Sequence, residues 1–361
     1  MSSAWDLGIF REHVQERIDA EMARQREVLA ELGPDMTQLV DAIEGLLAGG
    51  KRLRAAFCHS GYLACGGAHA EQMTSVATAM EMFQAAALLH DDVMDDSATR
   101  RGRATAHRAL ANRHGQESWT GDADRFGVSG AILAGDLCLV WTDEMVAGSG
   151  LPVEELDRAR TVFDVMRTQL MGGQFLDVLV SVRGWDGLAT TERIEQTRQV
   201  VRYKSAKYSV EHPLLIGAHA AGVDDTAAAH LSAYGLALGE AFQLRDDVLG
   251  IFGDPSTTGK PAGDDLREGK RTVLLALTLD CLDAEGRATM SAGLGHNDLT
   301  DDEIETMRDL VRGSGALERH EEIITEQTTI ARAELSAITD LTETGRAALE
   351  ELVDIATERD R

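Results

Sequence analysis

Proline is rare enough in this chain to leave long stretches that can run as uninterrupted helix. Only 5 of the 361 residues are proline, and a proline inside a helix removes a backbone hydrogen bond and clashes with the preceding turn. Elsewhere apolar residues recur every three or four positions, which is the period of an amphipathic helix. No stretch shows the sustained alternation with β-branched residues that is typical of strands, so strands are improbable. We therefore expect an all-α fold.

The helical period extends over most of the chain. We expect helices at residues 4–30, 35–48, 51–65, 69–97, 128–148, 153–182, 190–211, 226–252, 270–283, 302–312 and 315–359. Two stretches rich in glycine and aspartate, Gly115–Gly127 and Gly253–Glu268, are expected to be loops. We find no internal repeat at a fixed period, and we expect a single domain over residues 1–361.

The chain is strongly acidic. With 35 Lys and Arg against 61 Asp and Glu, its formal net charge is −26. A surface this negative repels the phosphates of nucleic acids and of anionic lipids, so neither is an expected partner. A phosphate-bearing ligand would need a locally basic site or bridging divalent cations.

Nothing in the sequence predicts stable insertion in a membrane, or export. No segment approaches the ~18 to 20 consecutive apolar residues that span a bilayer, and Met1–Arg17 carries three acidic residues, unlike a signal peptide. The four cysteines are scattered, without a CxxC pair, which favours buried free thiols in a reducing compartment. We expect a cytoplasmic protein.

The strongest chemical signal is an aspartate cluster at the end of an apolar helix, HDDVMDD at residues 90–96. Asp91 and Asp95 are four residues apart, so on a helix their carboxylates project from one face, one turn or ~5.4 Å apart. Carboxylate oxygens without His or Cys ligands favour Mg²⁺ or Mn²⁺. The alternative is an acidic helix end on the surface, but the aspartates continue the apolar stripe of Val76, Met80 and Phe83 instead of opposing it.

A second acidic pair, Asp246 and Asp247, lies in FQLRDDVLG at residues 242–250, also within an apolar helix. A charged pair in such a helix is costly unless it binds something. One such pair is often a satisfied structural feature. Two pairs, each near basic residues, indicate a metal-bridged diphosphate held between facing helices.

Basic residues accompany both acidic pairs. In GGKRLR (49–54), Lys51 and Arg54 lie at an expected helix start, where free N–H groups and the helix dipole favour anions. The segment RRGR (100–103) follows the first acidic pair within a short turn. Arginine is used almost everywhere else, so the few lysines indicate positions that need a compact ammonium group. These five are Lys51, Lys204, Lys207, Lys260 and Lys270.

Together these segments resemble the trans-prenyl diphosphate synthase family over about residues 35–275. The resemblance is carried, in order, by GGKRLR, DDVMDD with RRGR, GGQFLD (172–177), FQLRDDVLG and GKPAGDDLREGK (259–270). It is closest to the geranylgeranyl-type synthases of actinobacteria. It implies an isoprenoid-synthase-type bundle of about ten or more helices around a central cavity, with C-terminal helices at 301–361, and a homodimer.

The resemblance also implies roles for individual residues. Asp91, Asp92 and Asp95 match the family's first aspartate-rich motif, and Asp246 and Asp247 match the second. The implied metal ligands are Asp91, Asp95, Asp246 and Asp247. The implied ligands of the allylic diphosphate are Arg100, Lys204, Lys260 and Lys270. Those of isopentenyl diphosphate are Lys51, Arg54, Gln84 and Arg101. Ser205 matches a position where many members have threonine, and Gln243 matches the family's glutamine near the reacting carbons.

Two positions depart from the family pattern. Gly250 stands where the second motif usually has a third aspartate, so a metal contact from that position is lost. Lys270 lies one residue beyond the spacing found in other members.

The implied reaction is the Mg²⁺-dependent head-to-tail condensation of isopentenyl diphosphate with dimethylallyl, geranyl or farnesyl diphosphate. Mg²⁺ and the lysines would stabilise charge on the departing diphosphate while the allylic C–O bond breaks to a cation. The isopentenyl double bond would attack that cation, and a proton would then leave, with no side-chain base evident from the sequence.

The residues before Asp91 on the same helix should set the product length. Ala86 and Ala87 are small and would leave a tunnel open. Phe83, eight residues before Asp91 and ~12 Å along the axis, would form its floor. We expect a C20 product, geranylgeranyl diphosphate, with farnesyl diphosphate or a longer chain as the alternative. The competing interpretation of Phe83 is an ordinary core aromatic.

Two other classes of protein remain as alternatives. A class I terpene cyclase also has an aspartate-rich helix, but its second metal motif is of the Asn-Ser-Glu type and it would not need the GGKRLR site. An inactive partner subunit of a hetero-oligomer would have lost aspartates or lysines, and this chain keeps nearly all of them.

Overall fold

The computed structural model describes residues 5–185, 187–253, 263–296 and 298–357. By the packing of its backbone, the chain forms two compact units. The first unit comprises Met1–Thr161, Pro213–Val223 and Asp340–Leu349, and the second comprises Val162–His212, Asp224–Thr339 and Glu350–Arg361. The expected single domain over residues 1–361 stays a prediction.

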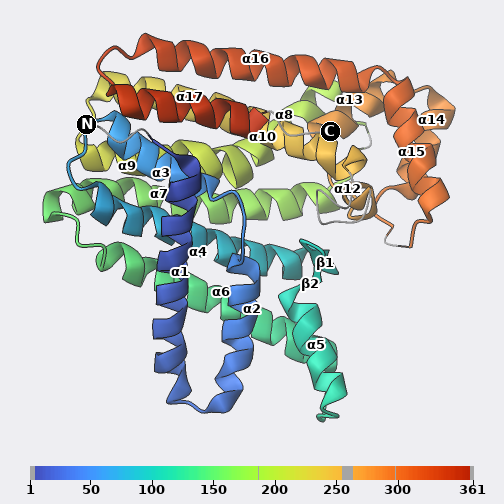
Figure 1. Ribbon diagram of the computed structural model, residues 1–361. Helices are drawn as coiled ribbons and strands as arrows, with labels where there is room; N and C mark the ends of the chain where they lie inside the picture. Colours follow the sequence, from blue (N-terminus) through green and yellow to red (C-terminus); the bar gives the residue numbers. More distant parts are fainter. Residues whose placement is uncertain (1–4, 186, 254–262, 297, 358–361) are drawn as a thin grey trace. The chain divides into compact units, whose positions relative to one another are not determined.

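The first unit is helical apart from one small hairpin (Figure 1). Its elements are α1 (Leu7–Ala30), η1 (Pro34–Met36), α2 (Thr37–Leu47), α3 (Leu53–Ala64), α4 (Ala70–Met94), β1 (Thr99–Arg100), β2 (Arg103–Ala104), α5 (Ala106–Gln116) and α6 (Ala123–Ala147). Helix α4 packs against α3 and α6. Glycine permits a close approach, since a Cβ on Gly61 of α3 would lie 2.3 Å from the carbonyl oxygen of Leu214.

The described residues of the second unit form helices and connecting loops, without a strand. It contains α8 (Thr190–Val200), the π-helix η2 (Val201–Glu211), α10 (Asp225–Phe252), α12 (Asp264–Arg267), α13 (Val273–Cys281), α14 (Ala284–Gly293), α15 (Asp301–Gly313) and α16 (Ala316–Ala337). Three helices have residues in both units: α7 (Val153–Val182), α9 (His212–Ala221) and α17 (Glu343–Thr357).

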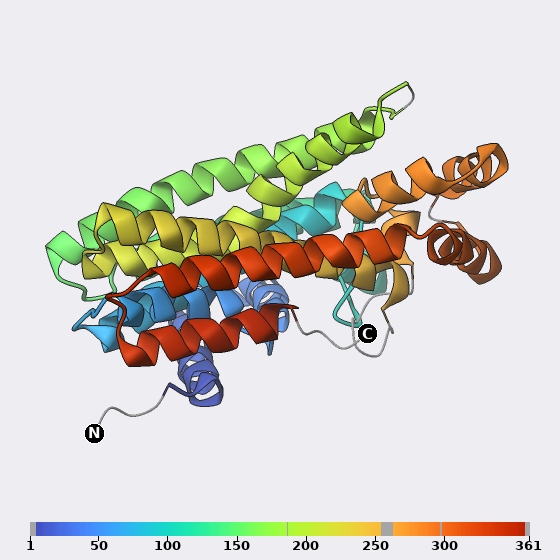
Figure 2. The same cartoon turned by 90° about the horizontal axis from the view of Figure 1, so that it is seen from above.

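The core of the second unit is built around α13. Every residue from Val273 to Leu279 is buried, and burying one Val or Leu side chain contributes roughly 1.5–3 kcal/mol. Helices α10 and α16 run side by side in both views (Figures 1 and 2). An all-round apolar helix such as α13 is stable only when other helices cover it on every side.

Most expected helices are confirmed, and the errors lie where tertiary contacts decide. The expected helix 153–182 coincides with α7, and 226–252 differs from α10 by one residue. The single helix expected at 315–359 is wrong, because the chain turns extended at Ile338 and Thr342 donates its backbone N–H to the carbonyl oxygen of Ala64. Helices α5, α9 and α14 were not expected. The expectation that strands are improbable fails at residues 99–104, which form β1 and β2.

Helix α6 is the one described helix whose length and apolar composition would suit a membrane span. It packs as a core helix of the first unit, against α4 and α5. A Cβ on Gly135 would lie 2.3 Å from the ring of His90 on α4, so the two helices are in close contact. A single helix of this kind is weak evidence for a membrane, because buried helices of soluble proteins have the same composition.

Candidate active site

The first aspartate cluster lies at the C-terminal end of α4. The backbone N–H of Asp95 donates to the carbonyl oxygen of Asp91 over 2.8 Å, so the two aspartates are one helical turn apart, as their spacing predicts. Asp91 is partly exposed and Asp95 is exposed, whereas Asp92 between them is only 2% exposed. Asp91 and Asp95 are therefore the accessible pair, and Asp92 is turned into the protein.

The hairpin after α4 carries two neighbouring arginines, Arg100 and Arg101, whose side chains contact different parts of the first unit. Arg101 and Gly102 both have positive φ, 52° and 72°, as a tight two-residue hairpin turn requires. Arg100 donates through Nε to Asp92 (2.6 Å), and its Nη2 lies 3.4 Å from Asp91 Oδ2. Arg101 instead donates through Nη1 to two carbonyl oxygens at the end of α2, at 3.0 and 3.4 Å. One short turn thus places one arginine at the site of the first aspartate cluster and the next arginine at the site of the α2–α3 loop.

The second of these sites is the loop between α2 and α3. Lys51 is exposed just before α3, and Arg54 is half-buried in its first turn. The guanidinium of Arg101 lies against the loop, 3.4 Å from where a Cβ on Gly50 would be. Gln84 lies on α4, two turns before Asp91. The acidic chain therefore has a locally basic site of the kind that an anionic ligand requires.

The second acidic pair lies on α10. Asp246 is half-buried, and Asp247 is only 2% exposed. Gln243 donates through Nε2 to Asp247 Oδ1 over 2.9 Å, so these two predicted site residues lie together. Among the described residues, the other carboxylate oxygen, Oδ2, is buried without a hydrogen-bond partner. Burial raises the pKa of Asp247 to about 7, while the nearby Lys270 lowers it.

Gly250, where the family's second motif usually has a third aspartate, faces another carboxylate. A Cβ on Gly250 would lie 2.1 Å from Oδ2 of Asp265, so that carboxylate occupies the space of the missing side chain. Asp265 is 6% exposed and its Oδ1 lies 3.9 Å from Nζ of Lys270. Asp265 raises the pKa of Lys270 and also that of Asp247, which places it near both. Sequence reasoning missed Asp265, although it lies in the segment GKPAGDDLREGK.

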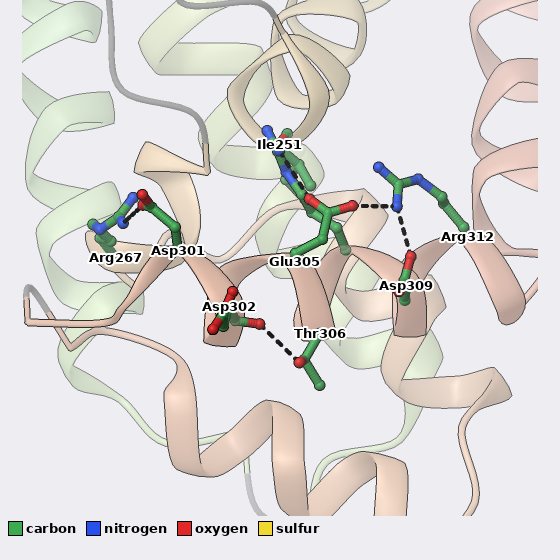
Figure 3. A network of polar contacts seen from close by, with 9 residues as sticks. Ile251, Arg267, Asp301, Asp302, Glu305, Thr306, Asp309 and Arg312 are labelled. Atoms are coloured by element: carbon green, nitrogen blue, oxygen red, sulfur yellow. Dashed lines mark hydrogen bonds and ion pairs between the residues drawn. The ribbon is translucent and has the colours of Figure 1, made fainter.

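The short helix α12, which carries Asp265, is held by α15. Arg267 donates to the carbonyl oxygen of Leu299 (3.1 Å) and to Asp301 (3.2 Å) at the start of α15 (Figure 3). Further along α15, Arg308 donates to the carbonyl oxygen of Ile251 over 2.6 Å. The same helix is therefore bonded to α12 and to the end of α10, which keeps Asp265 against Gly250.

Lys204 lies on the π-helix η2, which is packed between α7 and α10. A Cβ on Gly173 of α7 would lie 2.6 Å from the backbone nitrogen of Lys204, and one on Gly239 of α10 would lie 2.6 Å from Cα of Ala206. Lys204 forms an ion pair with Asp177 of α7. Asp177 is the second residue that sequence reasoning missed, although it ends the segment GGQFLD.

The residues expected to set the product length lie along α4. Phe83 is 1% exposed and Ala86 is fully buried, while Ala87 is half-buried. Phe83 is therefore buried in the first unit, which fits both a tunnel floor and an ordinary core aromatic. Ser205 is half-buried on η2. Lys260 lies outside the described residues.

A groove of about 830 Å³ lies between α10 and α16. Its lining includes the apolar residues Val248, Leu249 and Phe252, together with four glutamates and one arginine. The apolar residues lie on the face of α10 opposite to the second acidic pair, as the 3.6-residue period requires. A lining with more glutamates than arginines would repel a diphosphate, so this groove is not a candidate for the substrate site.

The described residues contain no group of three or more His, Cys, Asp or Glu side chains arranged to hold a metal ion. Neither acidic pair is therefore a complete metal site by itself. Asp91 and Asp95 belong to the first unit, and Asp246 and Asp247 belong to the second.

Known proteins match this chain over most of its length. The sequence pattern of the polyprenyl synthetase family matches residues 36–311. A geranylfarnesyl diphosphate synthase of Aeropyrum pernix is 31% identical over 316 residues, which are 86% of this chain and 91% of that protein. A nonaprenyl diphosphate synthase of Mycobacterium tuberculosis is 28% identical and covers 96% of this chain and 91% of its own.

A solved structure agrees with the fold. The crystal structure of a geranylgeranyl pyrophosphate synthase from Corynebacterium glutamicum, complexed with isoprenyl diphosphate and magnesium, has a TM-score of 0.93 to this chain. The two sequences are 39% identical, and the match covers 99% of this chain and 100% of that one. The all-α fold and the resemblance to actinobacterial synthases are both confirmed.

Proposed function

Because the chain belongs to the polyprenyl synthetase family and is a prenyltransferase, we propose that it joins isopentenyl diphosphate to an allylic diphosphate with Mg²⁺ and makes geranylgeranyl diphosphate. The observation that carries the proposal is the division of the two hairpin arginines. Arg100 contacts the first aspartate cluster, and Arg101 contacts the α2–α3 loop beside Lys51. Two separate sites, each with an arginine, suit a reaction of two diphosphates, whereas a cyclase has one diphosphate substrate.

The allylic diphosphate would be bound by cations that already contact acidic partners. Arg100 contacts Asp92, Lys204 contacts Asp177, and Lys270 lies near Asp265. Such pairs hold the cationic groups in place before the substrate arrives, which lowers the cost of ordering them. Lys260 completes this set by resemblance, and Ser205 on η2 is a further substrate-binding residue by resemblance.

The acidic pairs fit a hard divalent cation. Their ligands are carboxylate oxygens alone, which suit Mg²⁺ and also Mn²⁺. The buried Oδ2 of Asp247, which has no hydrogen-bond partner among the described residues, is where a cation would restore the lost solvation. The residues that would bind divalent cations are Asp91 and Asp95 in the first unit and Asp246 and Asp247 in the second. The chemistry that the cation supplies is neutralisation of charge on the departing diphosphate.

The chain's own residues would bind, orient and shield the reactants. Lys204 and Lys270 offset the charge that develops as the allylic C–O bond breaks. Gln243, which donates to Asp247, fixes the orientation of that carboxylate. Lys51, Arg54 and Arg101 hold the isopentenyl diphosphate so that its double bond can reach the allylic cation. The released diphosphate is the proposed acceptor of the proton that leaves last.

The C20 product is proposed from α4. Small residues at positions 86 and 87 leave room for a growing chain, and the buried ring of Phe83 closes it two turns below Asp91. Some relatives are named for longer products, geranylfarnesyl diphosphate and nonaprenyl diphosphate. The alternative is therefore a different chain length, not a different reaction.

A homodimer in the cytoplasm is proposed for the assembly. Ile132, Leu133 and Val140 project from one face of α6 and are 42%, 55% and 54% exposed. A row of large apolar side chains on one helix is a surface that a second copy can cover. None of the four cysteines, all of which are among the described residues, forms a disulfide there, which supports a reducing compartment.

The test is a turnover assay with isopentenyl diphosphate and each allylic primer in turn, followed by chromatography of the products. Diphosphate release that needs both substrates, with a C20 product, supports the proposal. Release from the allylic diphosphate alone, with a cyclic hydrocarbon, would indicate a cyclase. No release with any primer would indicate an inactive partner subunit.

A further inference from the structure

A buried ion pair ties the α2–α3 loop to α4 within the first unit. Arg52 stands between Lys51 and Arg54 in the GGKRLR segment, and the sequence pattern gives it no role. Its side chain is 4% exposed and that of Glu81 on α4 is 7% exposed, with Nη1 of the arginine 3.6 Å from Oε2 of the glutamate. Removing one partner of a buried pair leaves an uncompensated charge, which is costly. The pair therefore holds its surroundings in one arrangement.

Glu81 also takes the place of an N-cap side chain for α3. Its Oε1 accepts the backbone N–H of Ala55, the third residue of that helix, over 3.1 Å. An acceptor at this position satisfies one of the donors that every helix start leaves open. The N-cap residue itself is Arg52, with φ 52° and ψ 37°. This left-handed conformation is uncommon outside glycine, and it persists only where the surroundings require it.

The guanidinium of Arg52 reaches two further helices. Its Nη2 donates to Oε1 of Gln15 on α1 over 2.6 Å, and also to the carbonyl oxygen of Leu47 at the end of α2. Burial lowers the pKa of Arg52, and Glu81 opposes that effect. One side chain thus joins α1, α2 and α4 at the loop where Lys51 and Arg54 lie.

We infer that Arg52 and Glu81 are positioning residues for the isopentenyl diphosphate site, an inference that rests on the proposed function. They fix the start of α3, and with it Lys51 and Arg54, relative to α4. Gln84, the site residue on α4, lies one turn after Glu81, so the same pair relates both halves of the site. Arg52 is buried and paired, so it acts through its neighbours and not by touching the substrate.

Three substitutions separate the parts of this role. Glu81→Gln keeps an oxygen that can accept the N–H of Ala55 but removes the charge. Arg52→Lys keeps the charge but loses the planar fork that reaches three helices. Arg52→Gly suits the left-handed backbone and removes only the side chain. A matched control is Arg17→Gln, which removes a surface ion pair with Glu71 between the same helices, α1 and α4.

The measurements are calorimetric binding of isopentenyl diphosphate, the KM of each substrate, and the thermal unfolding midpoint. Arg52→Gly and Glu81→Gln should weaken isopentenyl diphosphate binding on the order of tenfold or more, because small displacements of a binding group are costly. The KM of the allylic diphosphate should change by less than about twofold. In the double variant the loss should not exceed that of the worse single variant, because the two residues act as one pair. Arg17→Gln should leave both affinities unchanged.

Several outcomes would overturn the positioning role. These are variants that unfold at a lower temperature but bind isopentenyl diphosphate as the wild type does, or an equal rise in both KM values. If Arg52→Gly does not fold, the same criteria apply to Arg52→Lys and Glu81→Gln, which nearly preserve volume. Wild-type protein that binds isopentenyl diphosphate without turnover would sink the proposed function alone. Wild-type protein that does not bind it would sink both.

Discussion

The carboxylate of Asp265 lies in the space that a side chain on Gly250 would need, with Oδ2 at 2.1 Å and Cγ at 2.4 Å from an ideal Cβ on that glycine. The usual third aspartate of the second motif cannot fit here while Asp265 stays in place. The second aspartate motif therefore does not lack its third carboxylate altogether. It has one at the same place, supplied from α12.

Gly250→Ala should lower both stability and turnover. Asp265 would have to move, and overpacking of this kind typically costs about 1–3 kcal/mol. Gly250→Asp should be worse, although it restores the family pattern, and Gly250→Asp combined with Asp265→Gly should recover part of the activity. The control is Gly313→Ala on α15, where an added Cβ would meet nothing within 4 Å. Denaturant unfolding and turnover are measured together, and a fully active Gly250→Asp variant would contradict this role of Asp265.

Two adjacent glycines on α7 give a second matched pair. Gly173→Ala would bring a Cβ to within 2.5–2.7 Å of the backbone of Tyr203 and Lys204, so it should displace η2 and reduce turnover. Gly172→Ala meets nothing within 4 Å and should be nearly neutral or slightly stabilising. Turnover and unfolding midpoints of the two variants check the prediction. If both variants were equally active, a displacement of η2 would have no effect on the function of Lys204.

Asp91→Ala should reduce turnover about 10²-fold or more, because it removes charge stabilisation that acts in the transition state. The control is Asp96→Asn. Asp96 is an exposed neighbour that accepts a hydrogen bond from Arg108, and asparagine tolerates its left-handed backbone conformation. Circular dichroism should show intact helices in both variants. Near-normal turnover of Asp91→Ala would refute the assignment of the first aspartate cluster.

The raised pKa of Asp247 predicts a pH-dependent response to Mg²⁺. Its pKa of about 7 lies above its ordinary value of 3.8. At a pH between these two values, the Asp247 carboxylate therefore takes up a proton when the metal-free chain folds. This contribution to stability is present at low pH and is lost as the pH rises through about 7. Mg²⁺ binds the ionised carboxylate and must displace the proton below that pH.

Mg²⁺ should therefore raise the thermal unfolding midpoint more at about pH 8 than at about pH 6. The Asp247→Asn variant should show a smaller rise and little difference between the two pH values. Scans with and without Mg²⁺ at both pH values provide the measurement. A larger rise at the lower pH would mean that Mg²⁺ does not compete with this proton.

Phe83→Ala should shift the products beyond C20, because it opens space two turns below Asp91 on α4. Removing a buried phenylalanine costs about 3–5 kcal/mol, so the assay is best run at low temperature, with Phe83→Leu as a milder variant. The control is Phe57→Ala, an equally buried aromatic on α3, which should lose stability without changing the product length. An unchanged product distribution in Phe83→Ala would leave this ring as an ordinary core residue.

The properties that depend on neighbouring residues could be predicted before the structure was known. The helical period defined most elements, and the four-residue spacing of Asp91 and Asp95 placed them one turn apart, because helix geometry relates near neighbours in a constant way. The order and spacing of the motifs were enough to identify the family.

Contacts between residues far apart in the chain could not be predicted in this way and became known from the fold. Asp265 against Gly250, Asp177 with Lys204, and Glu81 with Arg52 are contacts between separate elements, and no periodicity relates their positions. The break between α16 and α17 has the same cause, since it depends on bonds from Thr342 to the end of α3. Local propensity is a weak guide where packing and buried hydrogen bonds between distant segments set the backbone path.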